Sequence, residues 1–128
     1  MNNTMPNFSG MISIILVEDI TDYRQALKIL FNNTNGFCCL ADYASAEDCL
    51  NDTIFFFVYV AKNDLQLPRI NGIELIKALI QKKPALLCML CTAYEEDENI
   101  FHALEAGAHG YILKSTSPAQ ILEAVVEI

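Results

Sequence analysis

Acidic, hydroxyl and amine side chains follow or end four apolar segments of the sequence. Glu18 and Asp19 follow the first of these segments, Asp64 ends a second, and Thr92 and Lys114 end two more. Three carboxylates in close proximity repel one another unless a cation neutralises them, and carboxylate oxygens suit a hard ion such as Mg²⁺. A hydroxyl donor and an ammonium beside them could hold a transferred phosphoryl group, and an aspartate can be the nucleophile that accepts it.

Each of these residues also has an ordinary structural interpretation. Glu18 or Asp19 could cap the following helix, Thr92 could be a strand-end hydroxyl, and Lys114 could extend its amine to solvent. Four polar positions at four strand ends are, however, improbable as a coincidence. The pattern favours one shared site.

The elements that must position this site alternate between strands and helices. Strands are predicted over 11–17, 36–43, 55–61 (leading to Asp64), 86–92 and 110–114, and helices over 21–33, 45–53, 72–83, 95–107 and from 118 onward. Such alternation predicts a parallel sheet with helices on both faces. We expect an α/β fold of the flavodoxin-like, doubly wound class, with five strands in the order 2-1-3-4-5. Sites in such sheets form at the carboxyl ends of the strands, where the strand order reverses.

Local signals indicate where several helices begin and end. Thr21 is expected to cap the first helix, and Pro84 to end the third. Ser117 and Pro118 predict the start of the last helix, with Gln120 as the capping-box partner.

Length and composition set limits on the function. The chain has 128 residues, 53% of them hydrophobic, which suits one packed domain over 11–128 after a flexible tail over 1–10. A net charge of −8 argues against direct contact with nucleic acid or an anionic membrane. The last helix has no stop signal before Ile128, so we expect a C-terminal output domain beyond it.

Five cysteines without an export signal indicate a reducing, cytoplasmic setting. Cys88 and Cys91 match the spacing C-x-x-C, which also occurs in metal and redox sites. Residues three apart on a strand point to opposite faces, so core packing is the favoured interpretation.

Four motifs resemble a known family over residues 11–128. They are "LVEDI", "DLQLPRING", "CTA" and "GYILK", and together they resemble the receiver domain of two-component response regulators. The second motif is the most specific, because an aspartate is followed by proline four residues later and then by Asn-Gly.

This resemblance implies a role for each site residue. Asp64 would be the phosphoacceptor. Asp19 would bind Mg²⁺ directly, Glu18 directly or through water, and Gln66 through its main-chain carbonyl. Thr92 would donate a hydrogen bond to the phosphoryl group, and Lys114 would pair with it.

The resemblance also implies a switch. Thr92 would move towards the phosphoryl group and Tyr111 would turn inward, although Tyr111 could equally be a half-buried strand aromatic. Gln66 and Tyr94 occupy two variable positions that, in the resembled family, tune loss of the phosphoryl group.

The sequence departs from the family pattern beside the expected phosphoacceptor. Lys62 and Asn63 precede Asp64, where the family usually has apolar residues. This favours, as the alternative, a pseudo-receiver that acts by phosphorylation-independent protein contact. Ser115 also replaces the usual proline, and its run "KSTSP" is similar to receivers joined to LuxR-type helix-turn-helix output domains.

The expected partners follow from the resemblance. They are a sensor histidine kinase or phosphotransfer protein, the chain's own C-terminal output domain and, on activation, a second copy of the chain. The domain would be a signalling module and not a metabolic enzyme. An aspartyl phosphatase would need an acid in place of Gln66, and a flavodoxin would need a hydroxyl-rich loop where "EDITD" stands.

Overall fold

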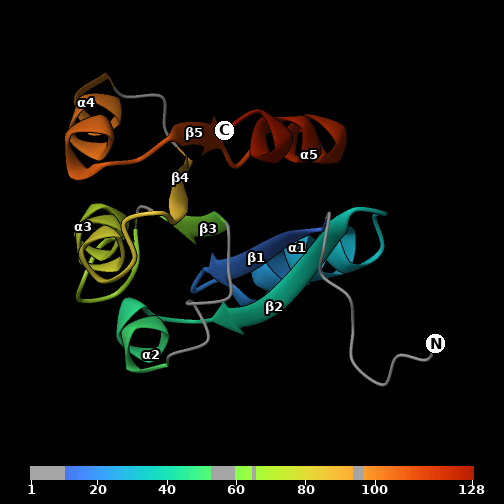
Figure 1. The fold of residues 1–128 in the computed structure, drawn as a ribbon, viewed down its shortest axis with the longest axis horizontal. Helices are drawn as coiled ribbons and strands as arrows, with labels where there is room; N and C mark the ends of the chain where they lie inside the picture. Colours follow the sequence, from blue (N-terminus) through green and yellow to red (C-terminus); the bar gives the residue numbers. More distant parts are fainter. Residues whose placement is uncertain (1–10, 53–59, 65, 94–96) are drawn as a thin grey trace.

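One parallel sheet forms the centre of the protein. The computed structural model describes residues 11–52, 60–64, 66–93 and 97–128. The strands are β1 (Ile12–Val17), β2 (Phe37–Tyr43), β3 (Val60–Asp64), β4 (Leu87–Thr92) and β5 (Gly110–Leu113). They lie in the order β2-β1-β3-β4-β5, so the chain crosses from β2 over β1 to reach β3 (Figure 1). The predicted flavodoxin-like α/β class is confirmed.

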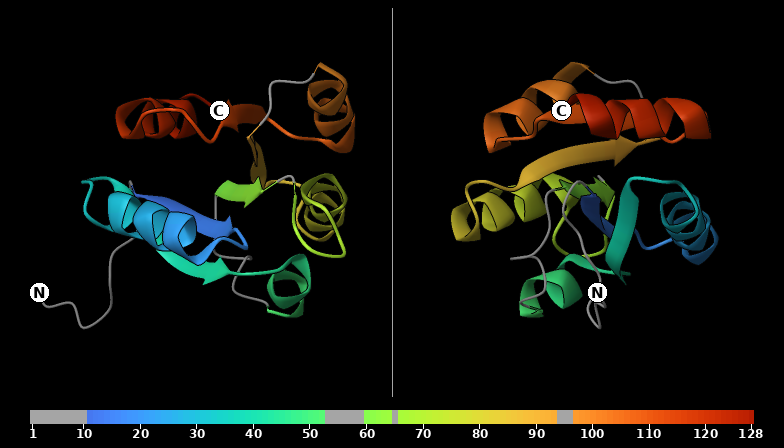
Figure 2. Two further views of the ribbon diagram at one scale, coloured as in Figure 1. Left: turned by 180° about the vertical axis from the view of Figure 1, so that it is seen from behind. Right: turned by 45° about the vertical axis from the view of Figure 1, so that its right-hand side comes forward.

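Helices cover both faces of this sheet. They are α1 (Thr21–Asn32), α2 (Ala46–Asn51), α3 (Gly72–Lys82), α4 (Asp97–Ala106) and α5 (Pro118–Glu127). Helices α1 and α5 lie on one side, and α2, α3 and α4 lie on the other (Figures 1 and 2). No helix in the described ranges has the length and apolar character needed to cross a lipid bilayer.

The side chains of alternate strand residues form two separate core layers. Ile15, Val17 and Leu90 pack under α2, α3 and α4, whereas Ile14 and Leu16 pack under α1 and α5. This alternation explains the C-x-x-C spacing, because Cys88 belongs to the first layer and Cys91 to the second. Both are free thiols, so the prediction of core packing is confirmed.

Strand β3 continues through its polar residues to Asp64. Asn63 pairs with Val17 of β1, and Asp64 pairs with Cys91 of β4. Main-chain pairing on both edges therefore keeps Lys62 and Asn63 in the strand. Their side chains, and the predicted strand residues before Val60, lie outside the described residues.

The predicted cap of α1 is wrong. Ile20, not Thr21, occupies the N-cap position, and its apolar side chain makes no capping hydrogen bond. Instead, the Glu18 carboxylate accepts a hydrogen bond from the Ile20 N–H at 3.0 Å, so an acid of the preceding turn satisfies this donor. The predicted cap and first residue of α5 are confirmed, because Ser117 Oγ accepts a hydrogen bond from the Gln120 N–H at 3.3 Å and Pro118 begins the helix. The capping-box role of the Gln120 side chain stays a prediction.

Candidate functional site

The polar residues singled out in the sequence meet at the carboxyl edge of the sheet. Glu18 follows β1, Asp64 ends β3, Thr92 ends β4 and Lys114 follows β5. Glu18, Asp64 and Thr92 are buried, with exposed fractions of 2%, 3% and 1%. Because neighbouring parallel strands end together, residues far apart in sequence share this edge.

Three carboxylates form an acidic cluster. Glu18, Asp19 and Asp64 each offer an oxygen, and these three atoms lie within 4.8 Å of one another. Glu18 Oε1 is buried, and the Lys114 ammonium is its close polar contact among the described residues. An oxygen-only donor set that contains buried carboxylates fits a hard divalent cation such as Mg²⁺.

Lys114 supplies positive charge to this cluster. Its Nζ lies 3.0 Å from Glu18 Oε1 and 3.2 Å from Asp64 Oδ2. The Lys114 side chain is only 20% exposed. Burial lowers the pKa of Lys114, but the contacts and charges of Glu18 and Asp64 outweigh this effect and raise the pKa above its usual value. Lys114 is therefore a fixed cation beside both acids.

The two buried acids differ in how readily they ionise. Burial raises the pKa of Glu18 to about 7, and the neighbouring Asp64 contributes in the same direction. Burial also acts to raise the pKa of Asp64, but contacts from Glu18, the Gln66 N–H and Lys114 outweigh it and lower the pKa below its usual range. The pKa values of these two neighbouring acids are therefore shifted in opposite directions.

The loop after β3 orients the Asp64 carboxylate. The Gln66 N–H donates a hydrogen bond to Asp64 Oδ1 at 3.2 Å, and the Gln66 side chain is exposed. Arg69 adopts a left-handed backbone conformation, with φ of 66°. The loop then ends in a capping box at the start of α3, formed by Asn71 and Glu74.

The acid turn, defined here as Glu18, Asp19 and Ile20, is held by its main chain. The Glu18 N–H donates to the Tyr43 carbonyl at 2.9 Å, and the Glu18 carbonyl accepts from Arg24 Nη1 at 2.7 Å. Sequence reasoning did not identify Arg24. The available signal was its position one helical turn into α1, close enough to reach back to the acids.

Tyr23 has a contact that its helical spacing did not predict. The hydrophobic stripe of α1 places it against the core, and its hydroxyl lies 3.7 Å from Cys91 Sγ. The Lys114 ammonium also lies 5.3 Å from the centre of the Tyr23 ring. Tyr23 therefore links α1 to the site lysine.

The remaining predicted residues lie in different places. The Lys114 N–H donates to the Thr92 carbonyl at 2.8 Å, which joins the ends of β4 and β5. Tyr111 is half-buried on β5 and pairs in register with Leu90 of β4. Tyr94 lies outside the described residues.

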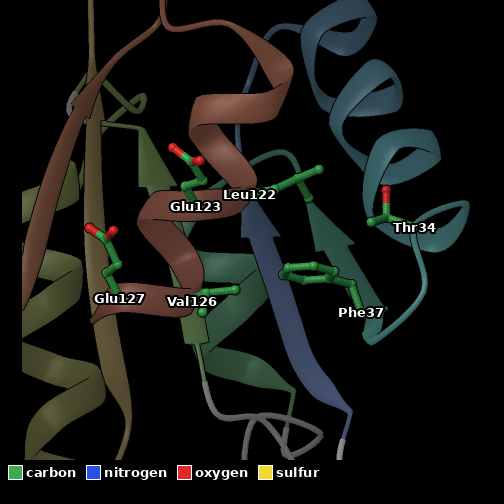
Figure 3. Close-up of a pocket in the computed structure, with 6 residues that line it drawn as sticks. All are labelled: Thr34, Phe37, Leu122, Glu123, Val126 and Glu127. Atoms are coloured by element: carbon green, nitrogen blue, oxygen red, sulfur yellow. The ribbon is translucent and has the colours of Figure 1, made fainter.

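A shallow apolar cavity of about 280 Å³ lies away from these residues (Figure 3). It is bordered by Phe37, the first residue of β2, and by Leu122 and Val126 of α5. Because parallel strands begin and end at opposite edges of a sheet, this cavity is not part of the acidic cluster.

Comparison with known proteins decides the family. The family model described as "Response regulator receiver domain" matches residues 14–126. The chain belongs to this family.

Relatives of this receiver domain include transcriptional regulators. It is 30% identical to the DNA-binding transcriptional activator DevR/DosR of Mycobacterium tuberculosis, over 92% of this chain and 54% of that protein. It is 36% identical to the transcriptional regulatory protein YxjL of Bacillus subtilis, over 89% of this chain and 52% of that one. The receiver domain thus spans about half the length of the curated relatives it matches.

A solved structure agrees with this assignment. The two-component response regulator of the LuxR family from Aurantimonas superimposes with a TM-score of 0.83 at 27% identity. The match covers 91% of this receiver domain and 84% of that chain.

Proposed function

We propose that this receiver domain accepts a phosphoryl group on Asp64 in a Mg²⁺-dependent reaction. The observation that carries the proposal is the convergence of Glu18, Asp19, Asp64 and Lys114 at one edge of the sheet. The donor would be a phosphohistidine on a sensor histidine kinase or phosphotransfer protein. One oxygen of Asp64 would form the new O–P bond while the bond between phosphorus and the donor nitrogen breaks, and that nitrogen retains the electron pair.

Each neighbouring residue has a proposed role in this transfer. Glu18, Asp19, Asp64 and the Gln66 carbonyl would hold Mg²⁺, which, when bound, neutralises negative charge on the phosphoryl oxygens. Lys114 would pair with one of those oxygens, and Thr92 would donate a hydrogen bond to another. The lowered pKa of Asp64 supports its role, because a carboxylate must be ionised to attack.

Phosphorylation would then change the surface of the domain. Thr92 would move towards the phosphoryl group and Tyr111 would turn inward, which would alter the face formed by α4, β5 and α5. Gln66 and Tyr94 would tune the lifetime of the acyl phosphate. The named relatives, a DNA-binding transcriptional activator and a LuxR-family response regulator, support a transcriptional output. This output would act through a C-terminal, helix-turn-helix domain, and the receiver would form a homodimer on activation. The acidic receiver itself would not contact DNA.

The alternative function is a pseudo-receiver that acts by constitutive protein contact. The polar pair Lys62 and Asn63, directly before Asp64, is the observation that favours it. In that case Asp64 would take up no phosphoryl group.

Intact-mass measurement with acetyl phosphate distinguishes the two functions. The wild type is expected to gain one phosphoryl group only when Mg²⁺ is present, and Asp64→Asn is expected to gain none. Asp48→Asn, which changes an exposed aspartate on α2, is the matched control and should gain the group normally. Uptake by Asp64→Asn would identify another acceptor, and no uptake by folded wild type would favour the pseudo-receiver.

A further inference from the structure

We propose that Arg24 is a positioning residue for the acid turn: it fixes the peptide unit between Glu18 and Asp19 so that both carboxylates are set for a divalent cation. This inference rests on the proposed function, because it assigns the cation to the acidic cluster. Arg24 would act on the carboxylates through the main chain, by way of its hydrogen bond to the Glu18 carbonyl.

The Arg24 guanidinium joins two elements. Its Nη1 donates to the Glu18 carbonyl at 2.7 Å, and its Nε donates to Asp42 Oδ2 of β2 at 3.1 Å. Both side chains are largely removed from solvent, with exposed fractions of 13% for Arg24 and 16% for Asp42. A short, partly buried, charge-assisted contact of this kind restricts motion more than an exposed ion pair does.

The main chain of Glu18 is consequently held from both sides. Its N–H bonds to Tyr43 of β2, and its carbonyl bonds to Arg24 of α1. The Glu18 carbonyl belongs to the peptide unit that leads to Asp19, and this unit is planar. Fixing its plane therefore limits the directions in which the Glu18 and Asp19 side chains leave the backbone.

The shape of the guanidinium matters for this role. Nε and Nη1 present two N–H groups in one rigid plane, so a single side chain can bond to a carboxylate and a carbonyl at once. A lysine has one ammonium on a flexible stem and cannot reproduce the fork. Arg24→Lys should therefore act as a partial loss and not as a conservative change.

Lys28 offers a matched control on the same helix. Its Nζ lies 3.0 Å from Asp42 Oδ1, the other oxygen of the carboxylate that Arg24 contacts. Among the described residues, the Lys28 ammonium bonds to Asp42 and not to the acid turn. Lys28→Met removes a positive charge next to Asp42 and leaves both Arg24 hydrogen bonds in place.

Calorimetric Mg²⁺ titration of the whole chain tests the proposal. Loss of a residue that orients metal ligands typically weakens metal affinity by about 10–100-fold, and Arg24→Met should show a loss at the lower end, about tenfold. The Mg²⁺ affinity of Arg24→Lys should lie between those of Arg24→Met and the wild type. The Mg²⁺ affinity of Lys28→Met should stay within about twofold of the wild-type value, because a half-exposed ion pair contributes little. Unfolding midpoints without Mg²⁺, measured in parallel, report the purely structural effect of each substitution.

The outcomes separate this inference from the proposed function. If Arg24→Met lowers the stability of the protein but leaves the Mg²⁺ affinity of the folded protein unchanged, the positioning role is overturned. If the wild type binds no Mg²⁺, the metal site itself fails, and hydrogen exchange of the Ile20 amide then decides the positioning role. That amide bonds to the Glu18 carboxylate, so Arg24→Met should accelerate its exchange in the metal-free protein beyond the effect of Lys28→Met. Unchanged Ile20 exchange contradicts the inference.

Discussion

Lys114 Nζ lies 3.0 Å from Glu18 Oε1, a buried carboxylate oxygen of the acidic cluster. The lysine and a divalent cation would therefore be attracted to the same oxygen. In the metal-free protein the ammonium balances part of the charge of the acidic cluster. When a metal is bound, that ammonium would be available for a phosphoryl oxygen.

Replacing Lys114 should separate metal binding from phosphoryl uptake. Lys114→Met removes a positive charge a few ångströms from the cation site, so we expect Mg²⁺ affinity to rise about fivefold, which corresponds to about 1 kcal/mol of lost repulsion. Phosphoryl uptake from acetyl phosphate should fall at least about tenfold, because a group that stabilises the transferring oxygens is lost.

Calorimetry and intact mass measure the two effects in the same samples. Lys83→Met, which removes a lysine at the end of α3, is the control and should change neither. A variant of Lys114 with weaker Mg²⁺ binding would show that the lysine supports the metal site and does not compete with it.

Tyr23 should stabilise the protein partly through Lys114. A cation above an aromatic face is worth about 0.5–1 kcal/mol near the surface, and the ring centre lies 5.3 Å from the ammonium. A double-mutant cycle of Tyr23→Leu with Lys114→Met, measured by urea unfolding, should give a coupling energy of that size. Tyr23→Phe keeps the ring and should preserve the coupling, and a cycle with zero coupling would refute the contact.

Asp42 should make stability depend on pH in the acid range. Burial acts to raise the pKa of Asp42, but hydrogen bonds and charges from Lys28 and Arg24 outweigh it and lower the pKa below its usual value. A carboxylate with a lowered folded-state pKa stabilises the fold above its unfolded pKa, and this contribution disappears as pH falls through the folded value.

The difference in unfolding free energy between wild type and Asp42→Asn should therefore be constant near neutral pH. It should shrink as the pH falls below the ordinary aspartate pKa of about 4. Urea unfolding at several pH values between neutral and strongly acidic conditions measures it. A difference that grows on acidification would contradict the assigned direction of the pKa shift.

The capping box of α3 should contribute to stability without taking part in the chemistry. Asn71 Oδ1 accepts from the Glu74 N–H at 2.9 Å, and Glu74 Oε1 accepts from the Asn71 N–H at 3.1 Å. Asn71→Ala should lower the free energy of unfolding by about 1 kcal/mol, whereas Asn71→Asp keeps a capping oxygen and should cost much less. Mg²⁺ affinity should be similar in both variants, and a parallel loss of affinity would mean that this helix start also orients Asp64.

The sequence by itself determined the class of fold and the composition of the site. Alternation of apolar strands with amphipathic helices predicts a parallel sheet, and polar residues at the ends of β1, β3, β4 and β5 must then share one edge. The opposite orientation of Cys88 and Cys91 was predictable for the same reason, because the strand repeat is a local property of the backbone.

Only the tertiary structure decided how α1 serves the site. The predicted cap at Thr21 was wrong because the Ile20 carbonyl already accepts the first helical hydrogen bond, from the Arg24 N–H at 2.9 Å, so Thr21 lies inside the helix. Helical spacing placed Tyr23 in the core but could not place Lys114 beside its ring, since those residues are far apart in sequence. The contacts of Arg24 depend equally on how α1 packs against β2 and on where β1 ends. Such contacts result from the packing of distant segments, which no local pattern of residues encodes.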